Sequence, residues 1–341
     1  MVATTQTPPV RESKELLLAT KKYAHENRLH SWWHLWSTLG IFAALTFLIC
    51  LDFAWPWRML LGILSGLVLV RLFIIYHDYQ HGTLLRRSRI AAAIMSFYGL
   101  ITLNPPSIWN RSHEHHHRNN AKIYGADIGS YPVMTVEDYA KASRSKRLQY
   151  AISRHPITIA LGYFTVFLYG MCIRSLIVNP RLHKDSAIAL VIHVTMLVLL
   201  GIFAPDVLLF GAIIPFMVAA AAGAYLFYAQ HNFPGVELRN RAEWDYVFAA
   251  MRSSSYIKMN RLMAWFTGNI GYHHIHHLNA RIPFYRLPEA MAEMPELQDP
   301  LTTSLHPRDI AHCLRLKLWD PDRNQLVPFP SNANAAAQPS D

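Results

Sequence analysis

The chain has 341 residues, of which 52% are hydrophobic and only 16% are charged, so it is too apolar for an ordinary soluble domain. The formal net charge of +10 is compatible with nucleic acid, but the Lys and Arg residues lie in clusters between apolar segments rather than along one basic stripe. The three cysteines form no CxxC pair, which argues against a zinc ribbon and a disulfide framework. We therefore expect a membrane protein and no nucleic-acid partner.

The N-terminal segment, residues 1–30, is polar. It lacks the short apolar core and the small-residue cleavage site of a secretory signal. We expect it to remain on the protein as a cytoplasmic segment.

Four apolar runs lie at about 38–54, 59–76, 187–204 and 207–229. Each is close to the ~20 residues that a helix needs to cross about 30 Å of hydrocarbon. The connections LDFAWPW and APD contain no Lys or Arg, whereas the outer flanks of the runs are basic. By the positive-inside rule, the two short connections face outward and both termini face the cytoplasm. A soluble protein with buried helical hairpins is the alternative, but paired runs of this length are rare in soluble chains.

Two weaker apolar segments, at about 90–103 and 156–173, are expected at the membrane interface or as re-entrant elements. The second has basic residues at both ends, so a crossing there would break the charge pattern. Arg71 lies inside the second apolar run, and we expect its guanidinium to extend toward the interface. The sequence thus predicts an all-α integral membrane protein with four transmembrane helices and a cytoplasmic helical cap.

Histidines are concentrated in four short places. Of 19 histidines, 11 lie in HDYQH at 77–81, HEHHH at 113–117, QHN around 231 and HHIHH at 273–277. All four places lie at or beyond the expected cytoplasmic ends of the spanning runs. We therefore expect them to converge on one histidine-rich site in the cap.

The spacing within these boxes favours metal binding, because residues three or four positions apart share a helix face. The candidate metal ligands are His77, His81, His113, His116, His117, His231, His273, His276 and His277. Nine imidazoles exceed the four ligands of one tetrahedral zinc and suit two metal ions. Imidazole binds zinc, copper, iron and nickel alike.

Other histidines receive no metal-binding role. His115 and His274 lie off the shared spacing and are expected to be neighbours of the site or surface residues. His193 lies inside a spanning run and is expected to be a hydrogen-bonded interior residue. A chance arrangement of surface histidines is the alternative for any single box, and the repetition of HxxHH beside HxxxH argues against it.

With HDYQHG, HEHHHRNN and GYHHIHHL, the chain resembles the membrane fatty acid desaturases, which carry three histidine boxes in this order. YAQHNF and NIGYHHIHHLNARIPFYRL resemble the acyl-lipid branch of that family. The resemblance predicts a membrane desaturase domain over residues 31–295. Residues 296–341 follow as a cytoplasmic C-terminal segment, and the composition of its end, SNANAAAQPSD, is typical of a disordered tail.

The resemblance implies a di-iron centre held by the nine histidines, with no catalytic residue beyond the metal ligands and no other cofactor. Such an enzyme uses O2 and two electrons to remove two hydrogens from a fatty acyl chain, which we expect to be esterified in membrane lipid. Iron has the redox chemistry for this reaction and zinc does not. Some relatives have an asparagine one helical turn before the residue that matches His231, where this chain has Phe227, so that part of the second metal's shell is in doubt. No HPGG haem signature occurs, so a separate ferredoxin- or cytochrome-type carrier with its reductase is implied.

Two alternatives are a related di-iron hydroxylase or carotenoid-modifying oxygenase, and a metal-binding or transport protein without catalysis. A transport protein would be expected to carry polar or histidine residues in line inside its spanning runs. Apart from His193 and Arg71, these runs contain few such residues. The aromatic residues Trp109, Tyr98 and Trp265 lie near boxes. They fit a substrate tunnel and an interfacial belt equally well.

Overall fold

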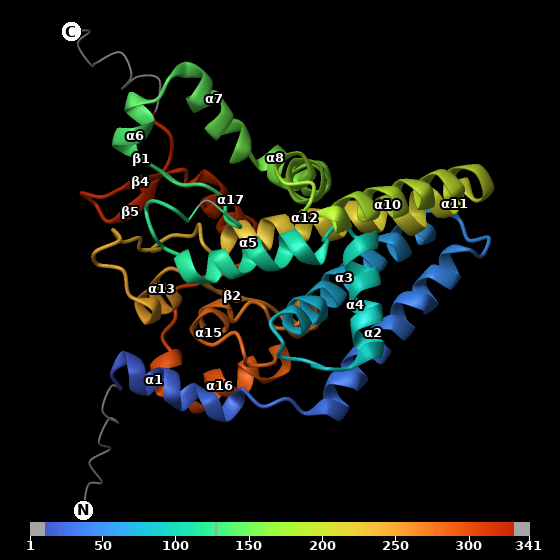
Figure 1. Cartoon of the computed structure of the whole chain (residues 1–341), viewed down its shortest axis with the longest axis horizontal. Helices are drawn as coiled ribbons and strands as arrows, with labels where there is room; N and C mark the ends of the chain where they lie inside the picture. The colour runs from blue at the N-terminus through green and yellow to red at the C-terminus, as the bar shows by residue number, and fades with distance from the viewer. Residues whose placement is uncertain (1–10, 127, 331–341) are drawn as a thin grey trace, which may run out of the picture.

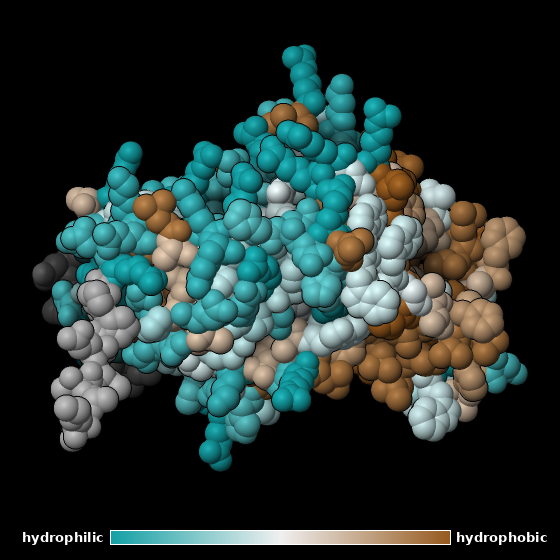
Figure 2. All heavy atoms as spheres, turned by 90° about the horizontal axis from the view of Figure 1, so that it is seen from below, coloured by the Kyte–Doolittle hydropathy of each residue, from teal (hydrophilic) through white to brown (hydrophobic). Residues whose placement is uncertain are grey.

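The computed structural model describes residues 11–126 and 128–330, and these are mainly helical. Four helical segments are long and apolar enough to cross a membrane, which fits a membrane protein and confirms the four predicted runs. They are α2 (Arg28–Ile49), α3 (Trp55–Gln80), α10 (Lys184–Phe203) and a segment made of α11 (Pro205–Val207), η3 (Leu208–Ile213) and α12 (Ile214–Ala229). Figure 2 shows hydrophobic side chains gathered at the end of the molecule toward which α2, α10 and α11 extend in Figure 1.

The boundaries of the first two spans differ from the predicted ones. Helix α2 begins at Arg28 rather than near residue 38, because the Asn27 side chain caps it by accepting a hydrogen bond from the His30 N–H. It ends at Ile49, and α3 then begins at Trp55 with a proline in its first turn. The first predicted run extended to residue 54 because the connection between the two helices is also apolar.

Helices α3 and α12 pack closely in the centre of the molecule. A Cβ atom on Gly66 would lie 2.7 Å from the Val218 Cβ and 2.8 Å from the Pro215 carbonyl oxygen. Gly62 approaches α12 and η3 in the same way, with the Phe210 carbonyl oxygen 2.6 Å from a Cβ built there. Small residues at such a crossing let two helix backbones meet, as is common in membrane proteins.

The weaker apolar segments form shorter helices that lie outside the set of possible spans. These are α4 (Arg89–Ile101), α8 (Pro156–Ala160), the π-helical η2 (Tyr163–Arg174) and α9 (Ser175–Val178). His193 of α10 fixes two of them, because its Nε2 lies 2.6 Å from the Tyr163 hydroxyl and its Nδ1 lies 2.7 Å from the Ile101 carbonyl oxygen. The prediction of a hydrogen-bonded interior histidine is confirmed.

The prediction for Arg71 was wrong. Its side chain is buried rather than extended to an interface, with the residue 3% exposed. It donates to the Thr38 hydroxyl at 3.2 Å and to the Trp265 carbonyl oxygen, and its Nη2 lies 3.1 Å from His34 Nδ1. The guanidinium also lies over the Trp265 ring at 4.3 Å. These partners satisfy the charge inside the protein, so it does not need to reach water.

Shorter elements lie at the other end of the spans (Figure 1), where Figure 2 shows a mainly hydrophilic surface. The helices are α1 (Ser13–Thr20), η1 (Lys21–Tyr23), α5 (Pro106–Asn119), α6 (Val136–Lys141), α7 (Arg144–Ser153), α13 (Tyr246–Arg252), α14 (Arg261–Phe266), α15 (His273–Leu278), η4 (Phe284–Arg286), α16 (Leu287–Glu293), η5 (Pro295–Leu297) and α17 (Pro307–Arg315). We call this part the cap.

Two small sheets tie distant parts of the cap together. Strand β1 (Met134–Thr135) pairs in parallel with β4 (Leu318–Asp320), and β4 pairs antiparallel with β5 (Gln325–Val327). Strand β2 (Tyr256–Lys258) pairs in parallel with β3 (Thr302–Ser304). The predicted disordered tail, residues 331–341, lies outside the described residues.

Candidate metal centre

Four elements deliver the predicted histidines to one buried region. The end of α3 carries His77, and His81 is its C-terminal capping residue. Helix α5 starts at a proline, which favours the first turn of a helix, and carries the second box in its last two turns. Short helix α15 carries the third box, and His231 lies just beyond the end of α12. The packing of α3 against α12 positions His77, His81 and His231 at neighbouring helix ends, and α5 and α15 bring the other six histidines to them.

The nine histidines form two groups. In each group, one ligand nitrogen from every residue lies within 4.8 Å of the others. The first group contains His77, His81, His113, His117 and His276, and the second contains His116, His231, His273 and His277. His116 and His117 belong to different groups, and so do His276 and His277. Adjacent residues on a helix point about 100° apart at 3.6 residues per turn, so they face different groups.

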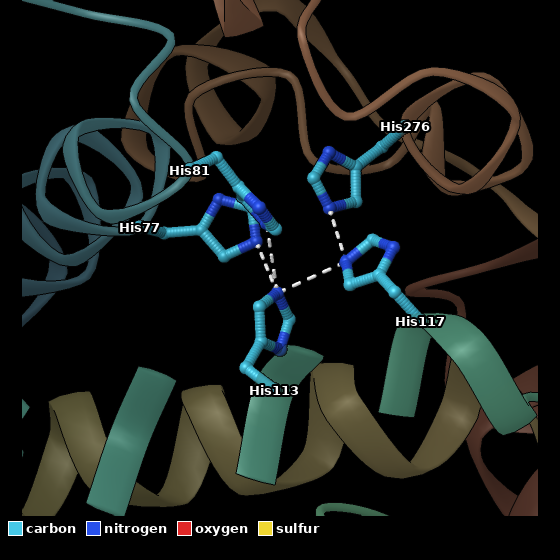
Figure 3. Close-up of side chains that lie close together, drawn as sticks. All are labelled: His77, His81, His113, His117 and His276. Atoms are coloured by element: carbon cyan, nitrogen blue, oxygen red, sulfur yellow. Dashed lines mark hydrogen bonds between the residues drawn. The ribbon is translucent and has the colours of Figure 1, made fainter. Parts of the chain in front are cut away.

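The first group converges on His113 (Figure 3). The His113 Nε2 atom lies 3.0 Å from His77 Nε2, 3.0 Å from His81 Nε2 and 3.1 Å from His117 Nε2. His276 Nε2 lies 3.1 Å from His117 Nε2. One ring nitrogen carries at most one hydrogen, so these contacts cannot all be hydrogen bonds. Converging lone pairs of this kind fit a bound cation.

The second group is built in the same way. His116 Nε2 lies 3.2 Å from His277 Nε2, and His273 Nε2 lies 3.0 Å from His231 Nε2. The Phe227 ring, one turn before His231, lies 5.1 Å from the His116 ring. Phe227 adds an apolar wall here instead of a polar ligand.

Partners on the opposite ring nitrogens orient three of these imidazoles. His77 Nδ1 lies 3.0 Å from the Asp78 carboxylate, His116 Nδ1 lies 2.6 Å from the Ser130 hydroxyl, and His231 Nδ1 lies 3.0 Å from the Ser253 carbonyl oxygen. The carboxylate and the carbonyl oxygen only accept hydrogen bonds, so they place the proton on Nδ1 and leave Nε2 with a free lone pair. This is the tautomer that a metal ligand needs.

Burial keeps the imidazoles of the cap neutral. It lowers the pKa of His81 to about 3 and that of His231 to about 4. For His113 and His276, burial first and neighbouring imidazoles second hold the pKa well below its usual range. Neutral imidazole is the form that binds a metal ion, so the donor set fits a metal centre.

Asp78 and Ser130 are the functional candidates that sequence reasoning missed. Asp78 is 1% exposed, and its second oxygen accepts a hydrogen bond from the Phe284 N–H at 2.7 Å. Its place directly after His77 was the available signal, because ligating histidines commonly pair with a carboxylate. Ser130 gave no local signal, because it lies 14 residues beyond His116 and meets it only in the folded chain.

We expect Asp78→Asn to lower metal affinity or activity by roughly 10- to 100-fold, since loss of a partner that orients a ligand has this effect in other metal sites. The amide can donate to His77 Nδ1 and so favour the wrong tautomer. Metal content after purification and turnover check the prediction. Asp52→Asn is the control, because Asp52 is exposed in the connection between α2 and α3. Equal metal content and equal turnover in the two variants would contradict the role of Asp78.

The two histidines expected to be neighbours of the site lie outside both groups. His274 is buried and its Nε2 lies 3.3 Å from the Leu297 carbonyl oxygen. The Nε2 of His115 lies 2.9 Å from the Gly125 carbonyl oxygen. Each ring thus contacts a backbone oxygen instead of the converging nitrogens.

A largely apolar cavity of about 540 Å³ reaches the histidines. Its walls come from α3, α4, α5, η2 and α12, and it includes His77 and His113 of the first group and His273 of the second. Tyr98 and Trp109 line it, as expected for a tunnel, whereas Trp265 is not among its lining residues and lies against Arg71. The volume lies within the range of pockets that enclose small molecules.

Comparisons with known proteins agree with this geometry. The family model described as fatty acid desaturase matches residues 53–308, a range that includes all nine histidines. A fatty acid desaturase of Bacillus subtilis (strain 168) is 31% identical over 330 residues, which cover 93% of this chain and 91% of that protein. The chain belongs to the fatty acid desaturase family.

Proposed function

We propose that the protein is a membrane desaturase that introduces a double bond into a fatty acyl chain with O2 and two electrons from a separate carrier. Family membership implies an oxidoreductase. The observation that carries the specific reaction is the cavity, whose apolar walls reach imidazoles of both histidine groups. An apolar chain in this cavity would lie beside both groups at once.

In this proposal the nine histidines hold two iron ions, five in the first group and four in the second. Iron at this site would supply the redox chemistry that breaks unactivated C–H bonds. The protein's part is to hold one pair of methylene carbons at a fixed distance from the ligand nitrogens. Leu69, Phe73 and Phe216 belong to the cavity wall and would exclude water from the acyl chain.

A lipid-borne substrate is supported by the surface of η2 and α9, which also line the cavity. Phe164, Tyr169 and Ile177 of these helices are 49%, 55% and 73% exposed, as expected for a surface that faces hydrocarbon. We propose that the acyl chain enters from the bilayer while still esterified. The termini and the histidine groups are proposed to lie on the cytoplasmic side, as the basic flanks indicate.

Expression in a host with saturated membrane lipids tests the function. We expect new unsaturated fatty acids by gas chromatography and mass spectrometry, and none with the His276→Ala variant or the empty vector. Hydroxylated or ketolated products without a new double bond would instead support an oxygenase of related type. The absence of any new product in cells that contain the iron-loaded protein would refute both.

A further inference from the structure

A second hollow lies apart from the acyl cavity, where the N-terminal segment meets η4 and α16. It is lined by His25, His30, Trp33, His34, Tyr285 and Arg286, together with Asn27 and the carboxylates Glu26 and Glu289. Its walls are tied together, since the Tyr285 hydroxyl accepts a hydrogen bond from the Asn27 N–H at 2.9 Å and Arg286 donates to the His25 carbonyl oxygen at 3.3 Å. We call it the entry groove.

The entry groove connects to the first histidine group through continuous contacts. The His34 ring lies 5.1 Å from the Phe284 ring. The Phe284 N–H donates to Asp78 at 2.7 Å, and the other Asp78 oxygen lies 3.0 Å from His77 Nδ1. Electronic coupling falls steeply across empty gaps and less along bonds and close contacts. This chain of contacts is therefore a path for an electron from the surface to the histidines.

The path does not cross the acyl cavity. Helix α3 faces the cavity through residues that include Leu69, Val70 and Phe73. It faces His34 through Arg71, whose Nη2 lies 3.1 Å from His34 Nδ1. A partner at the entry groove would leave the route of the acyl chain open.

Basic side chains flank the entry groove. The Arg28 guanidinium donates to the Arg86 carbonyl oxygen at 3.2 Å, and Glu26 accepts from the Leu85 N–H at 2.6 Å, which holds the 83–89 loop beside the groove. Arg86, Arg87 and Arg89 are exposed, and within the described part of the chain none of them forms a salt bridge. Figure 2, which views the molecule from the side of α1 and α16, shows a mainly hydrophilic cap. The groove carboxylates are balanced, since Glu289 pairs with Arg286 at 2.6 Å and Glu26 lies 3.8 Å from Arg28. The positive excess beside the groove therefore comes from the three exposed arginines, and such an excess attracts a protein of the opposite charge.

We propose that the entry groove and the arginines beside it bind an acidic, one-electron carrier protein with an iron–sulfur cluster or a haem. This inference rests on the proposed function, because it assigns the place where the two electrons enter. Each encounter oxidises one carrier by one electron. Two electrons from the carrier, two protons from solvent and the two hydrogens removed from the acyl chain together reduce O2 to two molecules of water, so the reaction balances.

The test compares two double charge reversals in the full chain. Arg86→Glu with Arg89→Glu alters the entry face, and Arg144→Glu with Lys146→Glu is the matched control. Both control residues are exposed on α7, which lies on the other side of the molecule from α1 and α16 (Figure 1). Binding of an acidic plant-type [2Fe–2S] ferredoxin to each detergent-solubilised protein is measured by surface plasmon resonance at low and high salt.

We expect Kd to rise at least about 10-fold for the entry-face variant at low salt and less than about 2-fold for the control, because charge pairs guide such encounters. The difference should shrink at high salt. Arg86→Gln with Arg89→Gln should give a smaller change in the same direction, and it replaces the reversal if that protein does not fold. Turnover is also measured with ferredoxin and with a reduced viologen dye as the electron donor. The ratio of the first rate to the second should fall most in the charge-reversal variant, less in the Gln variant and least in the α7 control.

Binding is measured without turnover, so it remains informative if the product is not an alkene. Equal Kd values in the entry-face and α7 variants would overturn the proposal. So would weaker binding of the entry-face variant to phosphatidylglycerol vesicles with an unchanged Kd for ferredoxin. That second result would assign the arginines to anionic lipid headgroups.

Discussion

His113→Ala is expected to abolish desaturation and to remove at least half of the bound iron. The His113 Nε2 atom lies within 3.1 Å of three other ligand nitrogens, so its loss opens the middle of the first group. Loss of a mere orienting partner costs 10- to 100-fold in other metal sites, and removal of a ligand should exceed about 100-fold. Iron by plasma mass spectrometry and fatty acid analysis are the two measurements. His276→Ala should behave in the same way.

His312→Ala is the matched control for these variants. His312 is exposed on α17 and lies outside both histidine groups. Its replacement should leave iron content and product yield at the level of the unchanged protein. Full activity of a purified, iron-depleted His276→Ala protein would refute the assignment of the ligands.

Gly223→Leu is expected to reduce turnover of long acyl chains by about 10-fold or more while iron content stays unchanged. Gly223 belongs to α12 and lines the cavity, with the Phe167 ring 3.8 Å from a Cβ built there. A leucine side chain would occupy space that the acyl chain needs, and overpacking of this kind costs roughly 1–3 kcal/mol. Turnover should recover with shorter chains. Product profiles from cells fed fatty acids of different length measure the effect.

Gly40→Leu separates this steric effect from a general effect of leucine in a spanning helix. No atom lies within 4 Å of a Cβ built on Gly40, which is exposed on α2. Both substitutions improve intrinsic helix propensity, so neither should unfold its helix. If Gly223→Leu and Gly40→Leu gave the same product profile, the cavity would not be the acyl site.

Local patterns predicted the parts of this protein that depend on short stretches of chain. The four spans follow from runs of apolar residues, and their placement is confirmed apart from their ends. The histidine spacing selected eight residues, the place of His231 after the fourth apolar run suggested the ninth, and the structure brings the same nine together. Their role as iron ligands stays a prediction. His193 was also assigned correctly, because a polar ring inside an apolar helix needs hydrogen-bond partners.

Predictions that depend on distant contacts were weaker. Arg71 was expected at an interface because the sequence around it contains no partner for its charge. Its partners, Thr38 and Trp265, come from other helices. The Ser130 contact with His116 and the entry groove could not be predicted either, because each is formed by residues that lie apart in the sequence.

The sequence by itself determined the membrane class, the histidine set and the resemblance to desaturases, because hydrophobic length and helical spacing are local properties. Only the tertiary structure decided that His116 turns away from His113 and His117 to a different group. Only the packing of α3, α4, α5, η2 and α12 decided that one cavity reaches both groups. Helix periodicity tells which side chains share a face, but the face they meet depends on residues far away in the chain, whose packing no short motif contains.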